Sequence, residues 1–190
     1  MTRLRVLAPF LCLAVLHLSA QTAKTQLAVY GTVALTNFGF YDNGSSGVSF
    51  KGDTGGIGGG MFWNFPIQSR VTAGADVRAL YSPGSKGGTS AAALLRIGFV
   101  PGRVRLRPYF EIGGGVVSST DYSLFTDRVT NGVAEFLGGL DIRLNDSVDL
   151  RAVEYGAAAA GSTSRTRSGF GFLDAGVVYH FHRAGKASMH

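Results

Sequence analysis

The chain has 190 residues, of which 28 are glycine and 16% are charged, and its formal net charge is +6. This length suits one domain, and the glycine content is about twice the usual share of roughly 7%. Basic residues form no runs and are not interleaved with aromatic residues, so we expect no nucleic-acid partner.

The first 20 residues have the three parts of a secretory signal peptide. "MTRLR" is positively charged, "VLAPFLCLAVLHL" is apolar, and "LSA" at 18–20 offers small residues for cleavage. The alternative is a buried N-terminal helix. Cys12, the single cysteine, lies inside this segment, so a chain cleaved after Ala20 has no disulfide, thiol nucleophile or cysteine-bound zinc. Cleavage also removes Arg3 and Arg5 and with them two positive charges.

Beyond the signal peptide, no apolar run is long enough for a membrane-spanning helix. The runs "AAALL" at 91–95 and "GAAAAG" at 156–161 are far shorter than the roughly 18 residues that a spanning helix needs. The sequence therefore excludes a protein anchored by helices.

Apolar and polar residues instead alternate with a period of two. After Gly132, Phe136 and Leu140 fall on one face, whereas Glu135 and Asp141 fall on the other. This pattern recurs in eight segments: 26–36, 54–65, 70–81, 90–100, 105–117, 131–144, 147–158 and 169–182. Long polar connections at 37–53, 82–89, 118–130 and 160–168 alternate with short ones at 66–69, 101–103 and 145–146. We predict an all-β fold, an eight-stranded antiparallel up-and-down β-barrel.

One predicted strand breaks the alternation. In "DLRAVEY", Arg151 and Glu154 fall on opposite faces. Either a β-bulge brings both side chains to the same face, or one of them points outward.

The charged face could be wetted, as in a soluble barrel, or enclosed, as in a membrane barrel. Only four lysines occur, and all of them lie in termini or predicted loops. The positively charged residues of the predicted strands are arginines, and they share a face with carboxylates such as Asp149. Arginine offers a planar fork of donors that suits enclosed carboxylates. We therefore predict a polar network in the lumen of a transmembrane barrel, formed by Asp76, Arg78, Arg96, Arg107, Glu111, Glu135, Asp141, Arg143, Arg151 and Asp174.

Aromatic residues favour the same interpretation. They gather near the predicted strand ends, as in the interfacial girdles of membrane barrels. The predicted girdle residues are Trp63, Phe65, Tyr81, Phe99, Tyr109, Tyr155, Tyr179 and Phe181. A soluble barrel with core aromatics is the alternative.

The last predicted strand carries "DAGVVYHF", in which Asp174, Gly176, Tyr179 and Phe181 are spaced as polar, glycine, aromatic and aromatic. This spacing resembles the C-terminal signature of bacterial outer-membrane barrels. With "GGLDIRLNDSVDLRAVEY" at 138–155, the chain is similar to the small eight-stranded family of OmpA-like transmembrane domains and OmpX-like proteins.

The resemblance implies a bacterial outer-membrane barrel at 21–182, surrounded by outer-membrane lipid and assembled by the barrel-assembly machinery. A tail at 183–190 follows the last aromatic residue, unlike in many relatives. We expect no peptidoglycan-binding domain, and we expect the protein to be a monomer.

The resemblance does not identify an activity. A lipid-deacylase group of such barrels has a His-x-Ser pair near its last strand, but this chain has His180-Phe181-His182. We expect no enzyme, no cofactor and no metal site. The leading hypothesis is a structural or surface-interaction barrel whose lumen is filled by side chains and whose extracellular ligand is unknown. The alternatives are a narrow, porin-like channel or small-ligand transporter, and a lipid-modifying enzyme.

Overall fold

The computed structural model describes residues 26–42, 48–68, 70–85, 87–100, 105–120, 128–160 and 166–181. The predicted signal peptide and the tail at 183–190 lie outside these residues, as does His182. The description below concerns the barrel.

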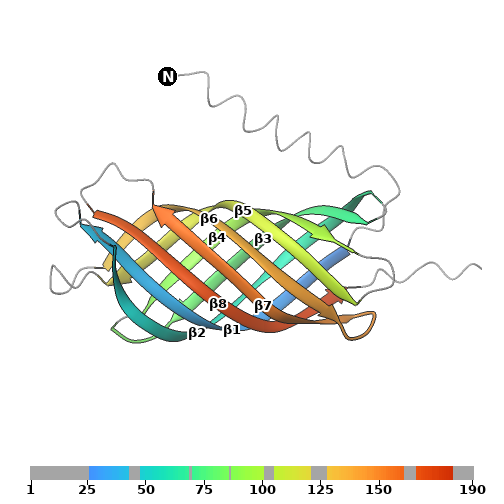
Figure 1. Cartoon of the computed structure of the whole chain (residues 1–190), viewed down its shortest axis with the longest axis horizontal. Coiled ribbons are helices and arrows are strands. Elements are labelled where there is room, and N and C mark those ends of the chain that lie inside the picture. The colour runs from blue at the N-terminus through green and yellow to red at the C-terminus, as the bar shows by residue number, and fades with distance from the viewer. Residues whose placement is uncertain are drawn as a thin grey trace, which may run out of the picture.

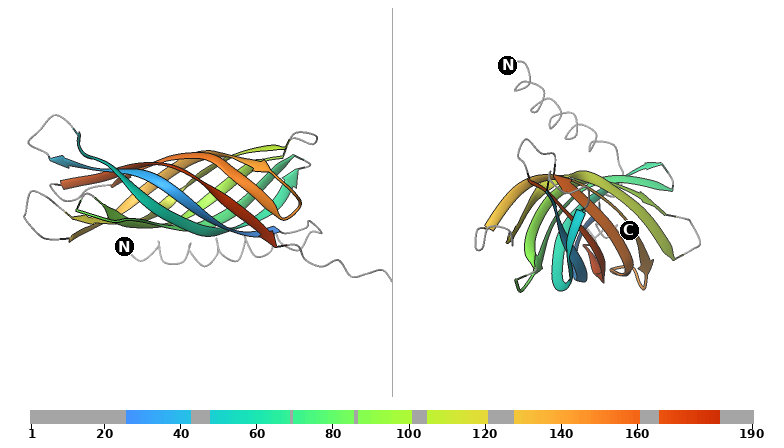
Figure 2. Two further views of the ribbon diagram at one scale, coloured as in Figure 1. Left: turned by 90° about the horizontal axis from the view of Figure 1, so that it is seen from below. Right: turned by 60° about the vertical axis from the view of Figure 1, so that its left-hand side comes forward.

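Eight antiparallel strands close into one barrel in chain order (Figure 1). The strands are β1 (Gln26–Asp42), β2 (Val48–Gln68), β3 (Val71–Ser82), β4 (Gly88–Phe99), β5 (Leu106–Thr120), β6 (Arg128–Arg143), β7 (Val148–Ala160) and β8 (Thr166–Phe181). Each strand pairs with the next, and β8 pairs with β1 from Leu27↔Phe181 to Asp42↔Thr166. Figure 2 shows the strands tilted around a common axis, as closure of a barrel requires. The predicted fold class is confirmed.

The barrel has two distinct ends. At the turn end, β1 begins, β8 finishes, and strands are joined by residues 69–70, 100–105 and 144–147. At the opposite, loop end, strands are joined by residues 43–47, 83–87, 121–127 and 161–165.

The predicted contrast between long and short connections is wrong. Most of the predicted loop at 37–53 belongs to β1 and β2, which stay paired as far as Tyr41↔Val48. Such pairing uses backbone groups, so a segment rich in Gly, Asn and Ser can extend a hairpin although it lacks apolar alternation.

Of the two alternatives for β7, the structure has the β-bulge. The pairing of β7 with β8 shifts between Arg151 and Glu154, and its pairing with β6 shifts between Leu140 and Asp141. Arg151 and Glu154 are both fully buried as a result, although they stand three residues apart.

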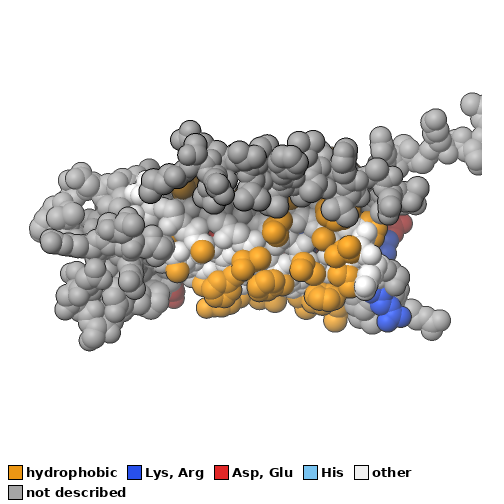
Figure 3. All heavy atoms as spheres, turned by 90° about the horizontal axis from the view of Figure 1, so that it is seen from above, with side chains coloured by type: hydrophobic (Ala, Val, Ile, Leu, Met, Phe, Trp, Pro, Cys, Tyr) orange, Lys and Arg blue, Asp and Glu red, His pale blue; other side chains and the backbone are white. Residues whose placement is uncertain are grey.

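The apolar face points outward and the charged face points into the lumen. Leu95 in β4 is 67% exposed, whereas its neighbours Leu94 and Arg96 are 3% and 4% exposed. Figure 3 shows apolar side chains gathered in a band on one face of the barrel. Exposed apolar residues around buried arginines are the arrangement of a membrane barrel rather than a soluble one.

One residue of the predicted aromatic girdle is misplaced. Trp63, Tyr81, Phe99 and Tyr155 are exposed on the outer face, but Tyr109 is only 4% exposed because it points into the lumen. Its position in the alternation of β5, between Pro108 and Phe110, accounts for this direction.

Among the described residues, none forms a helix long and apolar enough to span a membrane.

The outward face yields a depth-dependent prediction. Leu95→Arg should lower the free energy of unfolding by about 2–4 kcal/mol if this position lies near mid-bilayer, because the charge must leave water. Leu144→Arg at the turn end, where the side chain is 52% exposed, is the matched control and should cost about 0–1 kcal/mol. Urea titration of barrels refolded in lipid vesicles measures both, and equal costs would contradict the assignment of the lipid-facing band.

Candidate functional site

Nine charged residues from six neighbouring strands meet inside the barrel. We call them the ion-pair layer: Asp76 and Arg78 from β3, Arg96 from β4, Glu111 from β5, Glu135 and Asp141 from β6, Arg151 and Glu154 from β7, and Asp174 from β8. None of their side chains is more than 6% exposed. A buried charge is tolerated only when it is paired and hydrogen-bonded, so the contacts within this layer matter.

Glu154 is the centre of one half of the ion-pair layer. Its carboxylate lies 2.5 Å from Nη1 of Arg78 and 3.0 Å from Nη1 of Arg151, and it accepts a hydrogen bond from the hydroxyl of Tyr109. Arg78 also contacts Asp174 at 3.2 Å and Glu135 at 3.7 Å. One arginine therefore joins carboxylates from three strands.

Arg96 is the centre of the other half. Its two terminal nitrogens lie 2.5 Å from Glu111 and 2.9 Å from Asp141. Nε of Arg151 contacts Asp141 at 3.1 Å, so Arg151 links this half to Glu154. The ion pairs thus form one continuous network across the lumen.

Aromatic rings line the arginines. The guanidinium of Arg96 lies 3.6 Å from the ring centroid of Tyr109 and 4.2 Å from that of Phe62. Arg151 lies 4.2 Å from the ring centroid of Tyr30, whose hydroxyl donates to Asp76 at 2.9 Å. Cation–π contacts add stabilisation in a site removed from water.

Glycines make room for these inward aromatic rings. Tyr30 pairs with Gly60, Tyr109 with Gly139 and Phe172 with Gly156 across neighbouring strands. A Cβ at any of these glycines would collide with the ring opposite it. Crowding in a narrow barrel therefore explains part of the glycine content.

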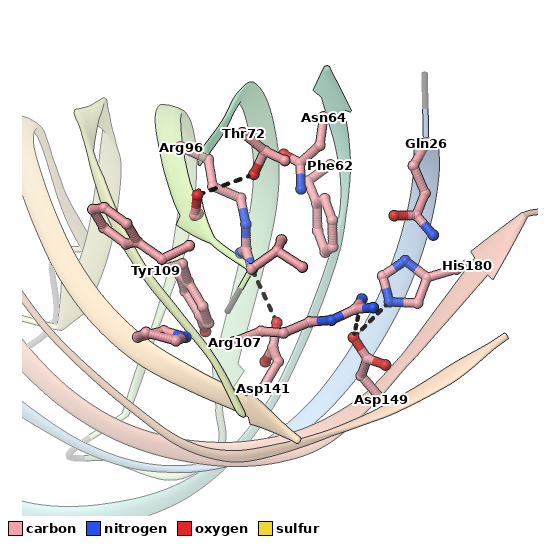
Figure 4. A pocket seen from close by; sticks show the side chains of 14 residues that line it. Gln26, Phe62, Asn64, Thr72, Arg96, Arg107, Tyr109, Asp141, Asp149 and His180 are labelled. Carbon is pink, nitrogen blue, oxygen red and sulfur yellow. Dashed lines mark hydrogen bonds and ion pairs between the residues drawn. The ribbon is translucent and has the colours of Figure 1, made fainter. Parts of the chain in front are cut away.

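At the turn end of the lumen, Asp149 contacts two basic side chains. It lies 3.0 Å from Nη1 of Arg107 and 2.8 Å from Nε2 of His180 (Figure 4). These residues line a cavity of about 40 Å³, which also reaches Arg96 and Asp141. A space of this size suits a few water molecules rather than an organic ligand.

A second, apolar layer fills the lumen towards the loop end. Phe38 stacks on Phe170 with ring centroids 5.5 Å apart, and Phe170 stacks on Phe172 at 5.7 Å. Other buried members are Leu80, Leu94, Val117, Val133 and Leu137. We call these residues the apolar layer. Phe172 connects the two layers because the guanidinium of Arg78 lies 4.6 Å from its ring centroid.

The structure separates the sequence-predicted lumen residues into two groups. All except Arg107 and Arg143 belong to the buried ion-pair layer, and Arg107 is 21% exposed beside Asp149 at the mouth. Arg143 does not join the network, and that prediction was wrong. It is the last residue of β6, where its 44% exposed side chain contacts Asp146 of the following turn.

Sequence reasoning missed several lumen residues. Glu154 was left out of the predicted network because the sequence allowed an outward position as well as a bulge, and the bulge places it in the lumen. The predicted lumen network named only charged residues, although Leu94 and Leu137 share the faces of Arg96 and Glu135 and belong to the apolar layer.

The assembly-signature residues lie on different faces of β8. Tyr179 and Phe181 are exposed on the outside, whereas Asp174 is buried in the ion-pair layer. Gly176 faces inward, where a Cβ would collide with the backbone oxygen of Gly31.

Within the part of the chain that the structure describes, no group of three or more His, Cys, Asp or Glu could hold a metal ion. The buried carboxylates of the ion-pair layer contact arginines instead, except Asp76, which accepts from the hydroxyl of Tyr30. The arrangement thus suits closure of the lumen rather than ligand binding.

The ion-pair layer yields a stability prediction. Glu154→Gln should lower the free energy of unfolding by about 3–5 kcal/mol, because it leaves Arg78 and Arg151 short of a buried partner. Arg143→Gln is the control and should cost at most about 1 kcal/mol, since its ion pair is exposed. Urea titration in vesicles tests both, and a Glu154→Gln barrel as stable as its parent would show that the layer is solvated.

Several solved barrels resemble this one. The N-terminal barrel of Pseudomonas aeruginosa OprF is 16% identical, with coverage of 79% of this chain and 97% of that chain and a TM-score of 0.49. Neisserial surface protein A is 18% identical, with coverage of 81% and 99% and a TM-score of 0.49. Yersinia pestis Ail is 9% identical, with coverage of 81% and 98% and a TM-score of 0.48. At these values the likenesses carry no functional argument.

No curated protein sequence matches the chain. Residues 8–182 match the family model described as "Outer membrane protein beta-barrel domain". This match spans most of the chain and includes all eight strands of the closed barrel. The protein therefore belongs to the outer-membrane β-barrel family.

Proposed function

We propose that this protein is a closed barrel of the bacterial outer membrane with a structural or surface-interaction role. The observation that carries the proposal is the filling of the lumen by two successive layers, one of ion pairs and one of apolar side chains. An eight-stranded barrel is only just wide enough to be filled by its own side chains.

The two layers oppose conduction for different physical reasons. In the ion-pair layer, every arginine is already bound to carboxylates, so a passing ion would have to compete with short contacts such as that between Arg96 and Glu111. In the apolar layer, the stacked rings of Phe38 and Phe170 offer an ion no polar partner. Loss of one layer leaves the other in place.

Outer-membrane barrels generally have their turns on the periplasmic side and their loops outside the cell, and we assign the turn end and the loop end of this barrel in the same way. In that orientation the ion-pair layer lies in the periplasmic half of the lumen, and the apolar layer lies below the loops. The loop end then carries the contacts with extracellular partners. Mass spectrometry of lipid A from a deletion strain tests the alternative of a lipid-modifying enzyme. No contact among the described residues supports that alternative.

The closed lumen makes a conductance prediction. The parent barrel should show no steady conductance in planar bilayers, and Glu154→Gln alone should not open it because the apolar layer persists. A Phe38→Ala/Phe170→Ala/Phe172→Ala variant that also carries Glu154→Gln should conduct, since it lacks the stacked rings of the apolar layer and the carboxylate that joins Arg78 to Arg151 in the ion-pair layer. The heat-dependent shift of the folded band on gels confirms that each variant is a barrel. Steady conductance of the parent would instead favour the narrow-channel alternative.

The last strand makes an assembly prediction. Tyr179 and Phe181 lie edge to face on the lipid side, with ring centroids 5.1 Å apart, so both rings are available to the barrel-assembly machinery. Tyr179→Ala or Phe181→Ala should slow assembly in cells, as followed by the heat-dependent band shift. Leu173→Ala, on the same face of β8, is the matched control.

Truncation after Phe181 should leave assembly largely intact, because the proposed signal ends at that residue. Normal assembly of Phe181→Ala together with failure of the truncated chain would reject this role for the signature.

A further inference from the structure

The ion-pair layer holds twice as many carboxyl groups as arginines. Its carboxyl groups belong to Asp76, Glu111, Glu135, Asp141, Glu154 and Asp174, and its arginines are Arg78, Arg96 and Arg151. None of these side chains is more than 6% exposed. If all of them were ionised, the layer would carry three unbalanced negative charges, and burial of unpaired charge is strongly unfavourable.

Basic residues beside the layer do not remove this excess. The cavity at the turn end brings Arg107 and His180 close to the layer. Both already contact Asp149, which is a further buried carboxylate. Together these three residues add one positive charge at most, and only when His180 is protonated. Negative charge in the layer would therefore remain unbalanced.

Contacts with arginine identify the carboxyl groups that are ionised. Asp141 contacts both Arg96 and Arg151. Glu154 contacts both Arg78 and Arg151. Two guanidinium partners stabilise the charged form of a carboxyl group, so Asp141 and Glu154 are ionised.

Four carboxyl groups have fewer such partners, and two of them contact another carboxyl group. Asp76 forms no ion pair among the described residues, but it accepts from the hydroxyl of Tyr30 and lies in hydrogen-bond contact with Glu111. Asp174 likewise lies in hydrogen-bond contact with Glu154. Two buried carboxyl groups in such contact are stable only when they share a proton.

Oxygen atoms without a donor mark where protons are needed. Glu135 approaches Arg78 only to 3.7 Å, which is beyond hydrogen-bond distance. Its Oε1 is buried and receives no hydrogen bond, and the same holds for Oε2 of Glu111 and Oδ1 of Asp174. A buried carboxylate oxygen without a donor is costly, whereas a protonated carboxyl group is neutral and can itself donate.

We propose that the ion-pair layer binds three protons at neutral pH. One is shared by Asp76 and Glu111, one lies on Asp174 beside Glu154, and one lies on Glu135. Three carboxylates then balance three arginines, and the layer has no net charge. Loss of these protons at higher pH leaves unbalanced charge in the lumen, so closure of the barrel by this layer depends on pH.

Bound protons link the stability of the barrel to pH. Carboxyl groups of the unfolded chain lose their protons at about pH 4, so above that pH the folded barrel holds protons that the unfolded chain lacks. Each such proton raises the equilibrium constant of unfolding about tenfold per pH unit. Stability should therefore fall as pH rises from about 5 until the layer is deprotonated. Urea titration in vesicles at a series of pH values measures this slope, and a parent whose stability does not fall would overturn the proposal.

A matched pair of aspartate variants assigns the slope to the layer. Asp76→Asn should reduce the pH dependence by one proton, or about tenfold per pH unit, because Glu111 then stays ionised. Asp146→Asn makes the same exchange at a turn residue whose side chain is 81% exposed, and it should keep the slope of the parent. The heat-dependent band shift confirms that each variant folds. In a barrel whose carboxyl groups were all ionised, Asp76→Asn would instead raise stability at every pH, and that result would reject the proposal.

Infrared spectroscopy detects the protons directly and needs no variant. The folded parent at about pH 7, in a detergent without carbonyl groups, should show the C=O stretch of protonated carboxyl groups and lose it at alkaline pH. Glu135→Gln should weaken this band by about a third, because one of three protons is lost. Absence of the band from the folded parent would contradict the proposal.

A bound sodium ion is the other way to balance the charge. Exchange of sodium for tetramethylammonium in the urea titrations separates the two ligands, because protons are available in both solutions. Equal stability in the two solutions supports bound protons. Loss of stability without sodium would assign the balancing charge to a metal cation and would overturn the proposal.

Discussion

Closure of eight strands into a ring is the constraint on which the other features of this protein depend. A membrane offers no water to unpaired backbone groups, so every strand must pair on both edges, and here β8 returns to β1 over its full length. Eight strands also make a narrow interior. The side chains that point inward must therefore fit together, and the rings of Tyr30, Tyr109 and Phe172 do so because each faces a glycine.

Burial in this interior determines how charge can be placed there. Each arginine of the ion-pair layer contacts at least two carboxylates, and Arg151 joins the two halves of the network. Such a network is costly to break because a remaining partner is left charged and buried. It also places charges within strands β3 to β8, where they interrupt long apolar runs. The charged residues that fill the lumen thus also favour membrane-spanning strands over a membrane-spanning helix.

The sequence by itself determined the fold class, the number of strands and the direction of their faces. Strict alternation, as at Phe136 beside Glu135, encodes which side chains share a face, because successive Cβ atoms of a strand point to opposite sides. Arginine in place of lysine within the strands indicated an enclosed polar face, and eight of the ten predicted network residues do lie in the buried layer. The break at Arg151 and Glu154 was visible as well, since the bulge disturbs a local pattern.

Only the tertiary structure decided which charges meet, because partners such as Arg78 and Asp174 are 96 positions apart and their contact depends on the register and tilt of intervening strands. It excluded Arg143 from the lumen, since a side chain with inward alternation still reaches water when its strand ends at the rim. It placed Tyr109 between two arginines instead of in the girdle. It also revealed the apolar layer, because alternation places Leu94 on the face of Arg96 but only the closed barrel brings it into one buried cluster with Phe38 and Phe170, which are distant in the sequence.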